Sequence, residues 1–231
     1  AYAMLGISDP AAKVTGGSAV FGGLDLLQAG EAALAELRGR DISMIFQSPR
    51  TALNPIRPIG QQIEDVLRRH AVATRGRTGP DQSLGVRERA IAALREVAIA
   101  DPERRWAAYP FELSGGMCQR ALIAMAFASE PALIVADEPT TALDVSTQAH
   151  IVQIIRGMQR DHRTSLLFIT HDLRLASRVC DDILVLYAGD IVEQGPAREV
   201  SERPRHPYTR ALQASNPPLG GTPRRLATLP D

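Results

Sequence analysis

The stretch from Leu113 to Asp144 constrains the fold more than any other part of the chain. It begins with a polar turn containing two glycines, Leu113–Gly116, and continues at helical spacing over Met117–Ser129. Five consecutive apolar residues follow at Ala132–Ala136, and the acid pair Asp137-Glu138 comes directly after them. A short apolar run with such boundaries is typical of a buried parallel strand. Because open α/β sheets bind ligands at the carboxyl ends of their strands, we expect the acid pair at that edge.

The two polar features of this stretch suit a nucleoside triphosphate. Glycines let the backbone approach an anion closely, and the N-terminus of the following helix presents free N–H groups. Ser114 adds a hydroxyl, while Asp137 and Glu138 can hold hydrated Mg²⁺ and polarise a water molecule. Taken singly, a Ser-Gly-Gly turn is an ordinary helix cap and an acid pair is usually solvated. The combination in this order is far more specific.

This combination resembles the ATP-binding-cassette (ABC) ATPases. LSGGMCQR (113–120) is similar to the family signature, Leu133–Glu138 to its Walker B strand, and Ala142–Asp144 to its D-loop. The resemblance implies an α/β fold: a P-loop NTPase core with a mainly parallel sheet and an inserted helical subdomain. The nucleotide-binding residues that it implies in these motifs are Ser114, Gly115, Gly116, Gln119, Asp137 and Asp144.

The resemblance also implies a division of roles. Glu138 would polarise the attacking water, Asp137 would hold Mg²⁺ mostly through water, and Asp144 would link two such domains. In the family, two domains pack head to tail with two ATP molecules between them. The signature residues Ser114–Gly116 would therefore act on the nucleotide of the other domain.

Two further residues gain a role only from the resemblance. Gln47 follows the β-rich run Ile42–Phe46, and IFQSP resembles the Q-loop, whose glutamine reaches Mg²⁺ and the nucleophilic water. The longer match FQSPRTALNP resembles that loop in dipeptide and oligopeptide importers. His171 follows the predicted strand Ser165–Ile169 and resembles the switch histidine that contacts the γ-phosphate. Taken alone, the glutamine is an ordinary surface residue and the histidine is incidental.

The C-terminal part carries one more resemblance. RHPYTRAL (Arg205–Leu212) is similar to a C-terminal motif of peptide-importer ATPases, although its residues alone indicate no chemical role. Some relatives carry a cysteine cluster beyond this motif. Here the cysteines are Cys118 and Cys180, so we expect no iron–sulfur centre. The proline-rich segment Asn216–Asp231 is expected to be a mobile tail.

These patterns predict four parts: a partial N-terminal core over 1–47, a helical subdomain with the signature over 48–128, a RecA-like core over 129–200, and a C-terminal motif with its tail over 201–231. Turn residues predict a hairpin around Gly22-Gly23 and two strands joined at Ala188-Gly189. We also expect a helix over Val145–Arg160 with Asp144 as its cap.

Composition narrows the possible partners. Lys+Arg and Asp+Glu both total 26, so the charge balance favours neither nucleic acid nor an anionic membrane surface. No apolar run approaches the ~18 residues that a membrane-spanning helix needs. Any membrane role is therefore expected to come through partner subunits. The two distant cysteines do not make a disulfide framework, so we expect a reduced, cytoplasmic protein.

One expected motif is missing from the sequence. The phosphate-binding loop of the family, G-x-x-x-x-G-K-[ST], does not occur, and the single lysine, Lys13, has no glycine pattern before it. Relatives carry that loop upstream of the segment that matches Ala1. We accordingly expect an N-terminally incomplete chain that binds nucleotide weakly and is inactive by itself.

For the complete protein, the resemblance implies a subunit that binds and hydrolyses ATP with Mg²⁺ and energises transport of di- or oligopeptides. Its implied partners are a second ABC ATPase domain, integral membrane permease subunits and an extracytoplasmic peptide-binding protein, and its implied place is the cytoplasmic face of the membrane. Two alternatives stay open: a non-catalytic partner domain that only donates its signature, and an ABC ATPase outside transport.

Overall fold

The computed structural model describes residues 1–70, 85–141 and 143–215. The chain divides into two compact units, Ala1–Leu167 and Phe168–Asp231. Most of the predicted polar loop Thr74–Gly85 and all of the predicted tail Asn216–Asp231 lie outside the described residues. The finer division into four parts stays a prediction.

The first unit begins with a 3₁₀ turn and a small hairpin. The turn η1 spans Tyr2–Leu5, where the sequence is helix-compatible. Strands β1 (Val20–Phe21) and β2 (Leu24–Asp25) pair antiparallel around Gly22-Gly23, as predicted. Both glycines have positive φ, at 57° and 85°, which explains why this tight turn needs residues without a side chain. Helix α1, Glu31–Leu37, follows.

A three-stranded sheet forms the centre of the first unit. Its strands, in the order β3-β4-β5, are Ile42–Ile45, Leu133–Asp137 and Ser165–Ile169. β3 and β4 run parallel, and Ile45 is the register partner of Ala136. Ile134, Val135 and Ala136 have no exposed surface, so the buried parallel strand predicted from the apolar run is confirmed.

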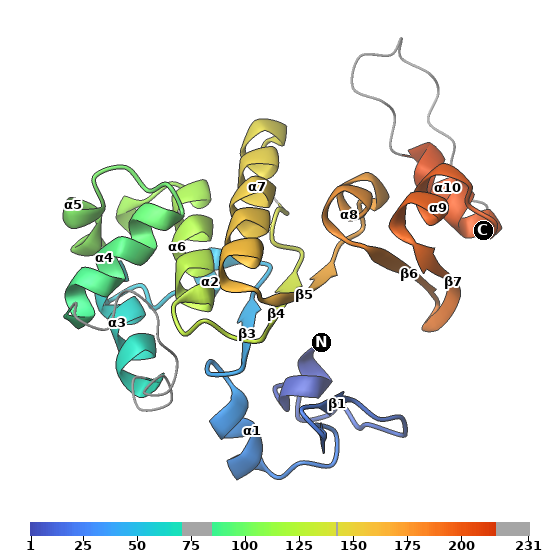
Figure 1. Cartoon of the computed structure of the whole chain (residues 1–231), viewed down its shortest axis with the longest axis horizontal. Coiled ribbons are helices and arrows are strands. Elements are labelled where there is room, and N and C mark those ends of the chain that lie inside the picture. Colours follow the sequence, from blue (N-terminus) through green and yellow to red (C-terminus); the bar gives the residue numbers. More distant parts are fainter. Residues whose placement is uncertain (71–84, 142, 216–231) are drawn as a thin grey trace. The chain divides into compact units, whose positions relative to one another are not determined.

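Helices fill the segment between β3 and β4. They are α2 (Pro49–Ala52), α3 (Ile59–His70), α4 (Val86–Glu96), α5 (Pro102–Trp106), the 3₁₀ turn η3 (Pro110–Glu112) and α6 (Gly115–Phe127). Figure 1 shows α3, α4 and α5 gathered on one side of α6, and the first two pack against it. Ile59, Ile63, Leu94 and Ile123 are fully buried in this group, so the prediction of a mostly helical segment is confirmed.

Two prolines of this segment lie where helices begin. Pro49 lies in the first turn of α2 and Pro102 in the first turn of α5. Proline has no N–H to lose there and its φ already suits the helix, so the same residue that ends one helix can begin the next.

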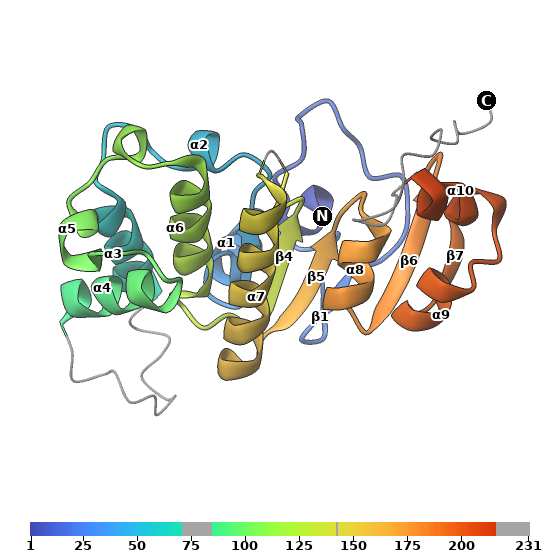
Figure 2. The same cartoon turned by 90° about the horizontal axis from the view of Figure 1, so that it is seen from above.

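Helix α7, Val145–His162, lies beside α6 (Figure 2) and runs two residues further than predicted. Ile151, Ile155 and Met158 form its buried stripe. Within the described ranges, every helix is too short or too polar to span a bilayer.

The second unit is built around an antiparallel hairpin. Strands β6 (Asp182–Tyr187) and β7 (Asp190–Pro196) pair with each other, and positive φ at Ala188 and Gly189 makes the predicted turn between them. The helices of this unit are α8 (Leu173–Val179), α9 (Ala197–Glu202) and α10 (Pro207–Ser215). Its core contains Leu173, Ala176, Ile183, Val185, Ala197 and Val200.

Candidate functional site

The acid pair lies at the carboxyl end of β4. Asp137 is the last residue of the strand and is half-buried. Glu138 follows with a φ of 45°, a left-handed conformation that is unfavourable for a residue with a side chain. Its carboxylate accepts a hydrogen bond from the Thr141 hydroxyl, and its carbonyl accepts one from the Thr141 N–H at 3.2 Å. This turn therefore holds the Glu138 side chain in a defined orientation.

Gln47 lies at the same edge of the sheet. Ile45 pairs with Ala136 in the parallel register, so Gln47 and Asp137 both follow the paired ends of neighbouring strands. Gln47 is exposed. An amide oxygen and a carboxylate are suitable ligands for Mg²⁺, which keeps several waters when proteins bind it. No group of three His, Cys, Asp or Glu residues within the described ranges could hold a metal, so water and phosphate would have to complete the coordination.

Tyr2 is an unexpected neighbour of the acid pair. Burial, followed by the nearby Asp137 carboxylate, raises the pKa of Tyr2 from its ordinary value. The contact joins the start of the chain to the end of β4. No local pattern could have predicted it, because the two residues are far apart in the sequence.

The predicted signature turn forms the N-terminus of α6. Ser114 is the cap residue, and its hydroxyl accepts a hydrogen bond from the Met117 N–H at 3.3 Å. Gly115 and Gly116 are the first helical residues. A side chain on Gly115 would meet open space, whereas a Cβ on Gly116 would lie 3.1 Å from the Thr147 methyl group. The second glycine therefore leaves room for the Thr147 side chain where α6 approaches α7.

Asp144 caps α7, as the sequence predicted. Its carboxylate accepts hydrogen bonds from the Thr147 N–H at 3.0 Å, the Thr147 hydroxyl at 2.6 Å and the Ser146 hydroxyl at 2.5 Å. The bond from Ser146, followed by those from Thr147, lowers the pKa of Asp144. Thr147 thus touches both Gly116 and Asp144, and brings the signature and D-loop resemblances to one corner of the unit.

Gln119 and Arg120 behave differently from the rest of the signature. Gln119 is only 2% exposed, and its Nε2 has no hydrogen-bond partner among the described residues. Arg120 donates to the Ala98 carbonyl at 2.8 Å and approaches His150 Nδ1 at 3.2 Å. It ties α6 to the end of α4 and to α7, a structural role that the motif did not predict.

His171 belongs to the second unit, whereas the other predicted site residues belong to the first. It is exposed and directly follows Thr170, whose hydroxyl accepts a hydrogen bond from the Asp172 N–H at 3.1 Å. Asp172 caps α8 by accepting N–H bonds from Arg174 and Leu175. The backbone on either side of His171 is therefore well defined.

The RHPYTRAL segment gains a structural role. The Glu193 carboxylate of β7 accepts the N–H groups of Arg205 at 2.8 Å and His206 at 3.0 Å. The Tyr208 ring lies 4.5 Å from the Tyr187 ring, centroid to centroid. The motif therefore anchors the start of α10 to the β6–β7 hairpin.

These bonds affect the charge of Glu193. Burial acts to raise its pKa, but hydrogen bonds from the Thr209 hydroxyl and from the Arg205 and His206 N–H groups lower it on balance. The Thr209 hydroxyl lies near the carboxylate without the geometry of a regular hydrogen bond, so the two N–H groups are the firmer contacts.

Comparison with known proteins identifies the family. The ABC transporter family matches residues 3–141, and the C-terminal region of oligopeptide/dipeptide transporters matches residues 192–231. Among solved structures, the dimeric ATP-binding cassette MJ0796 bound to ADP and Pi has a TM-score of 0.65 and 28% identity, covering 80% of this chain and 75% of its own. The chain belongs to the ABC transporter family and has the fold of its ATPase cassettes.

Its relatives include ATP-binding proteins of peptide transporters. The probable peptide ABC transporter ATP-binding protein y4tR of Sinorhizobium fredii is 46% identical over 95% of this chain and 63% of its own length. The dipeptide transport ATP-binding protein DppD is 42% identical in both Haemophilus influenzae and Escherichia coli, where the match covers 66% and 67% of the relative. The chain thus spans about two thirds of the length of these relatives.

Proposed function

We propose that this chain belongs to an ATP-hydrolysing subunit that energises the transport of di- or oligopeptides across the cytoplasmic membrane. The observation that most supports this proposal is the arrangement at the end of β4. There Glu138 follows Asp137 in a left-handed conformation, beside the end of β3. Backbone strain of this kind is concentrated at functional sites. The transport class is supported by the peptide-transporter relatives and by the match over residues 192–231.

In this proposal Glu138 polarises the water that attacks the γ-phosphate. The hydrogen bond from Thr141 fixes its carboxylate, so the group meets the water with little reorganisation. Gln47, which follows β3, is proposed to position the water, and His171, which belongs to the second unit, is proposed to sense the γ-phosphate. Each residue holds an exposed or half-buried position from which it can reach a ligand.

ATP and Mg²⁺ are the proposed ligands. Asp137 and Gln47 would hold the metal, which neutralises charge that develops on the phosphate oxygens. Ser114, Gly115 and Gly116 present the N-terminal N–H groups of α6, which suit a phosphate. Gln119 is proposed to support this turn from the buried face of α6, since its side chain is buried.

The partners follow from the same reasoning. We propose a head-to-tail dimer with a second ABC ATPase domain, in which the signature serves the partner's nucleotide and Asp144 lies at the junction. The related cassette MJ0796 is dimeric. The remaining proposed partners are membrane permease subunits and an extracytoplasmic peptide-binding protein, with the ATPase at the cytoplasmic face of the membrane and no nucleic acid involved.

The 231-residue chain contains no G-x-x-x-x-G-K-[ST] sequence. That loop supplies the lysine and backbone N–H groups that hold the β- and γ-phosphates. We therefore propose that this chain, measured alone, has no ATPase activity above background. A robust rate from purified chain would show that another group binds the phosphates.

The test uses the longer protein together with its membrane subunits. Glu138→Gln should retain ATP-dependent closure of the two ATPase domains while turnover falls at least about 100-fold, in the range for a general base. The matched control is Glu130→Gln, which removes an acid before β4, also at positive φ, and should leave turnover unchanged. Undiminished turnover in Glu138→Gln would remove Glu138 from its proposed role.

A further inference from the structure

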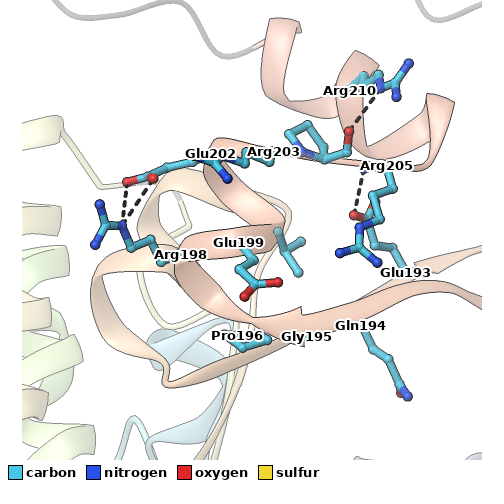
Figure 3. A pocket seen from close by; sticks show the side chains of 12 residues that line it. Glu193, Gln194, Gly195, Pro196, Arg198, Glu199, Glu202, Arg203, Arg205 and Arg210 are labelled. Atoms are coloured by element: carbon cyan, nitrogen blue, oxygen red, sulfur yellow. Dashed lines mark hydrogen bonds and ion pairs between the residues drawn. The ribbon is translucent and has the colours of Figure 1, made fainter.

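The second unit contains a charged hollow that the proposed function does not use. It has a volume of about 840 Å³ and lies between strand β7, helix α9 and the segment that leads into α10. Figure 3 shows the carboxylate of Glu199 and the guanidinium of Arg205 projecting into the space beside β7. The charged residues that line the hollow are Glu193, Arg198, Glu199, Glu202, Arg203, Arg205 and Arg210.

Several of these charges are already engaged. Arg198 Nε lies 3.2 Å from both carboxylate oxygens of Glu202, and Arg210 Nε donates to the Pro204 carbonyl at 3.0 Å. The Glu193 carboxylate accepts two backbone N–H groups. The Glu193 bonds join β7 to the segment that leads into α10, whereas the Arg198–Glu202 pair lies within α9 and the Arg210 bond joins that segment to α10 itself.

Three charges are left over. Within the described part of this unit, the side chains of Arg203, Arg205 and Glu199 form no ion pair or hydrogen bond. Two guanidinium groups therefore stand against one carboxylate, and the unengaged groups carry a net positive charge. Such a site attracts an anion that also offers a hydrogen-bond donor to Glu199.

The backbone fixes the two arginines in place. The Arg203 N–H donates to the Glu199 carbonyl at 2.9 Å, and the Arg205 N–H donates to Glu193 at 2.8 Å. Pro204 between them locks φ. A ligand that binds here has to order only the side chains, so less conformational entropy opposes binding.

The shape of the charges indicates the class of ligand. A guanidinium group presents paired N–H donors in a fork that matches a phosphate, which makes arginine the usual residue for this recognition. The hollow is far larger than one phosphate group and falls in the range of small-molecule sites, about 300–1,000 Å³. We propose that this arginine hollow binds a small organic phosphate, with Arg203 and Arg205 on the phosphate and Glu199 on a hydroxyl group of the organic part.

The hollow shares no residue with the proposed ATP site. All of its residues lie within 192–231, the part that matches the C-terminal region of oligopeptide/dipeptide transporters. The same phosphate chemistry could come from a soluble metabolite or from a lipid headgroup.

The probe is glycerol 3-phosphate, titrated into the 231-residue chain and followed by NMR, with glycerol as the uncharged control. We expect saturable binding with a dissociation constant below about 10 mM for the phosphate and none for glycerol. Arg203→Gln and Arg205→Gln should each weaken binding about tenfold, since each removes a charge-assisted contact. Glu199→Ala should weaken binding of glycerol 3-phosphate, because the acceptor for its hydroxyl group is lost, and should not weaken binding of inorganic phosphate, which lacks the organic hydroxyl group.

Arg178→Gln is the matched control: it removes an exposed arginine from α8 in the same unit, away from the hollow, and should leave binding unchanged. A second arm uses phosphatidic acid vesicles against phosphatidylcholine vesicles. Arginine-dependent binding of the vesicles assigns a lipid headgroup, and binding of the soluble probe alone assigns a metabolite. Absent binding in both arms, or equal weakening by Arg178→Gln and Arg205→Gln, would overturn the proposal.

Discussion

His162 Nε2 lies 2.7 Å from Glu96 Oε1, so the end of α7 is joined to the end of α4. The His162 ring also lies 5.7 Å from the Phe127 ring of α6. The hydrogen bond to Glu96 raises the pKa of His162, burial opposes it, and the charges of Glu96, Glu130 and Asp161 add to the rise. One histidine therefore connects three helices through a bond that depends on pH.

The first prediction concerns this pair. Because the folded-state pKa of His162 is raised above 6.5, its stabilising contribution is complete below that pH and is lost as the pH rises through the folded value. Glu96→Gln should lower stability by at most about 1 kcal/mol at pH 6 and have little effect at pH 9, since the pair is partly solvated. Urea unfolding at both pH values measures this difference, and NMR titration should find a lower His162 pKa in the variant. An equal loss at both values would contradict an ionic contribution.

The second prediction concerns the contact between Gly116 and Thr147. A Cβ at position 116 would lie 3.1 Å from the Thr147 methyl group, and that side chain is held because its hydroxyl bonds Asp144 at 2.6 Å. Gly116→Ala should therefore destabilise the chain by about 1–2 kcal/mol, as moderate overpacking does. A Cβ at position 115 would meet no neighbouring atom, so Gly115→Ala should leave stability unchanged or raise it.

Thr147→Ser provides the rescue for this prediction. It removes the methyl group and keeps the hydroxyl, so the double variant Gly116→Ala with Thr147→Ser should recover most of the lost stability. A double-variant cycle by chemical denaturation measures the coupling. If the two effects simply add, the contact does not restrict the signature turn.

Much of the structure around the signature turn and β4 could be predicted from the sequence, because it depends on residues that are close together in the chain. Residue type and position predict Asp144 as a helix cap, and a cap was the ordinary alternative for the Ser114 turn; both side chains accept the corresponding N–H bonds. The apolar run Ala132–Ala136 predicted a buried strand, and its last three residues, Ile134–Ala136, form the buried centre of β4. Patterns of this kind can be predicted because neighbouring residues alone determine them, and packing against other elements then stabilises the same structure.

The contacts between distant segments could not be predicted in this way. Tyr2 reaches Asp137, and Thr147 meets Gly116, only because the chain folds back on itself. The role of Glu193 was likewise hidden, since a strand glutamate looks like any solvated acid until the RHPYTRAL backbone lies against it. The predicted roles of Glu138, Gln47 and His171 stay proposals, because fold and family alone do not test them.

The third prediction concerns Glu193. Because the pKa of Glu193 is lowered in the folded chain, its contribution is present above 4.5 and is lost as the pH falls through the folded value. Glu193→Ala leaves the Arg205 and His206 N–H groups without this acceptor and should cost about 1 kcal/mol, allowing for partial exposure. Hydrogen exchange at these two amides should speed up at pH 7. Glu202→Ala, an exposed acid on α9, should leave both amides protected.

The fourth prediction concerns the packing of α3 against α5. Gly60 faces Trp106 so closely that a Cβ would lie 2.0 Å from the indole ring. The ring is held from two other sides, because its Nε1 donates to Glu64 at 3.0 Å and the Arg87 guanidinium lies 4.2 Å above its centroid. It cannot move without breaking both contacts, so Gly60→Ala should cost about 2–3 kcal/mol, at the upper end for overpacking.

Trp106 is the only tryptophan of the chain, so its fluorescence directly reports a displacement of this ring. In Gly60→Ala the emission should shift to longer wavelength as the ring becomes more exposed, and the urea midpoint should fall. Gly157→Ala is the matched control, because Gly157 lies in the middle of α7 and an added Cβ would meet no neighbouring atom. This substitution should stabilise the helix by up to about 1 kcal/mol. Unchanged emission in Gly60→Ala would mean that α3 and α5 can separate without cost, and that the Trp106 ring does not fix the position of these helices.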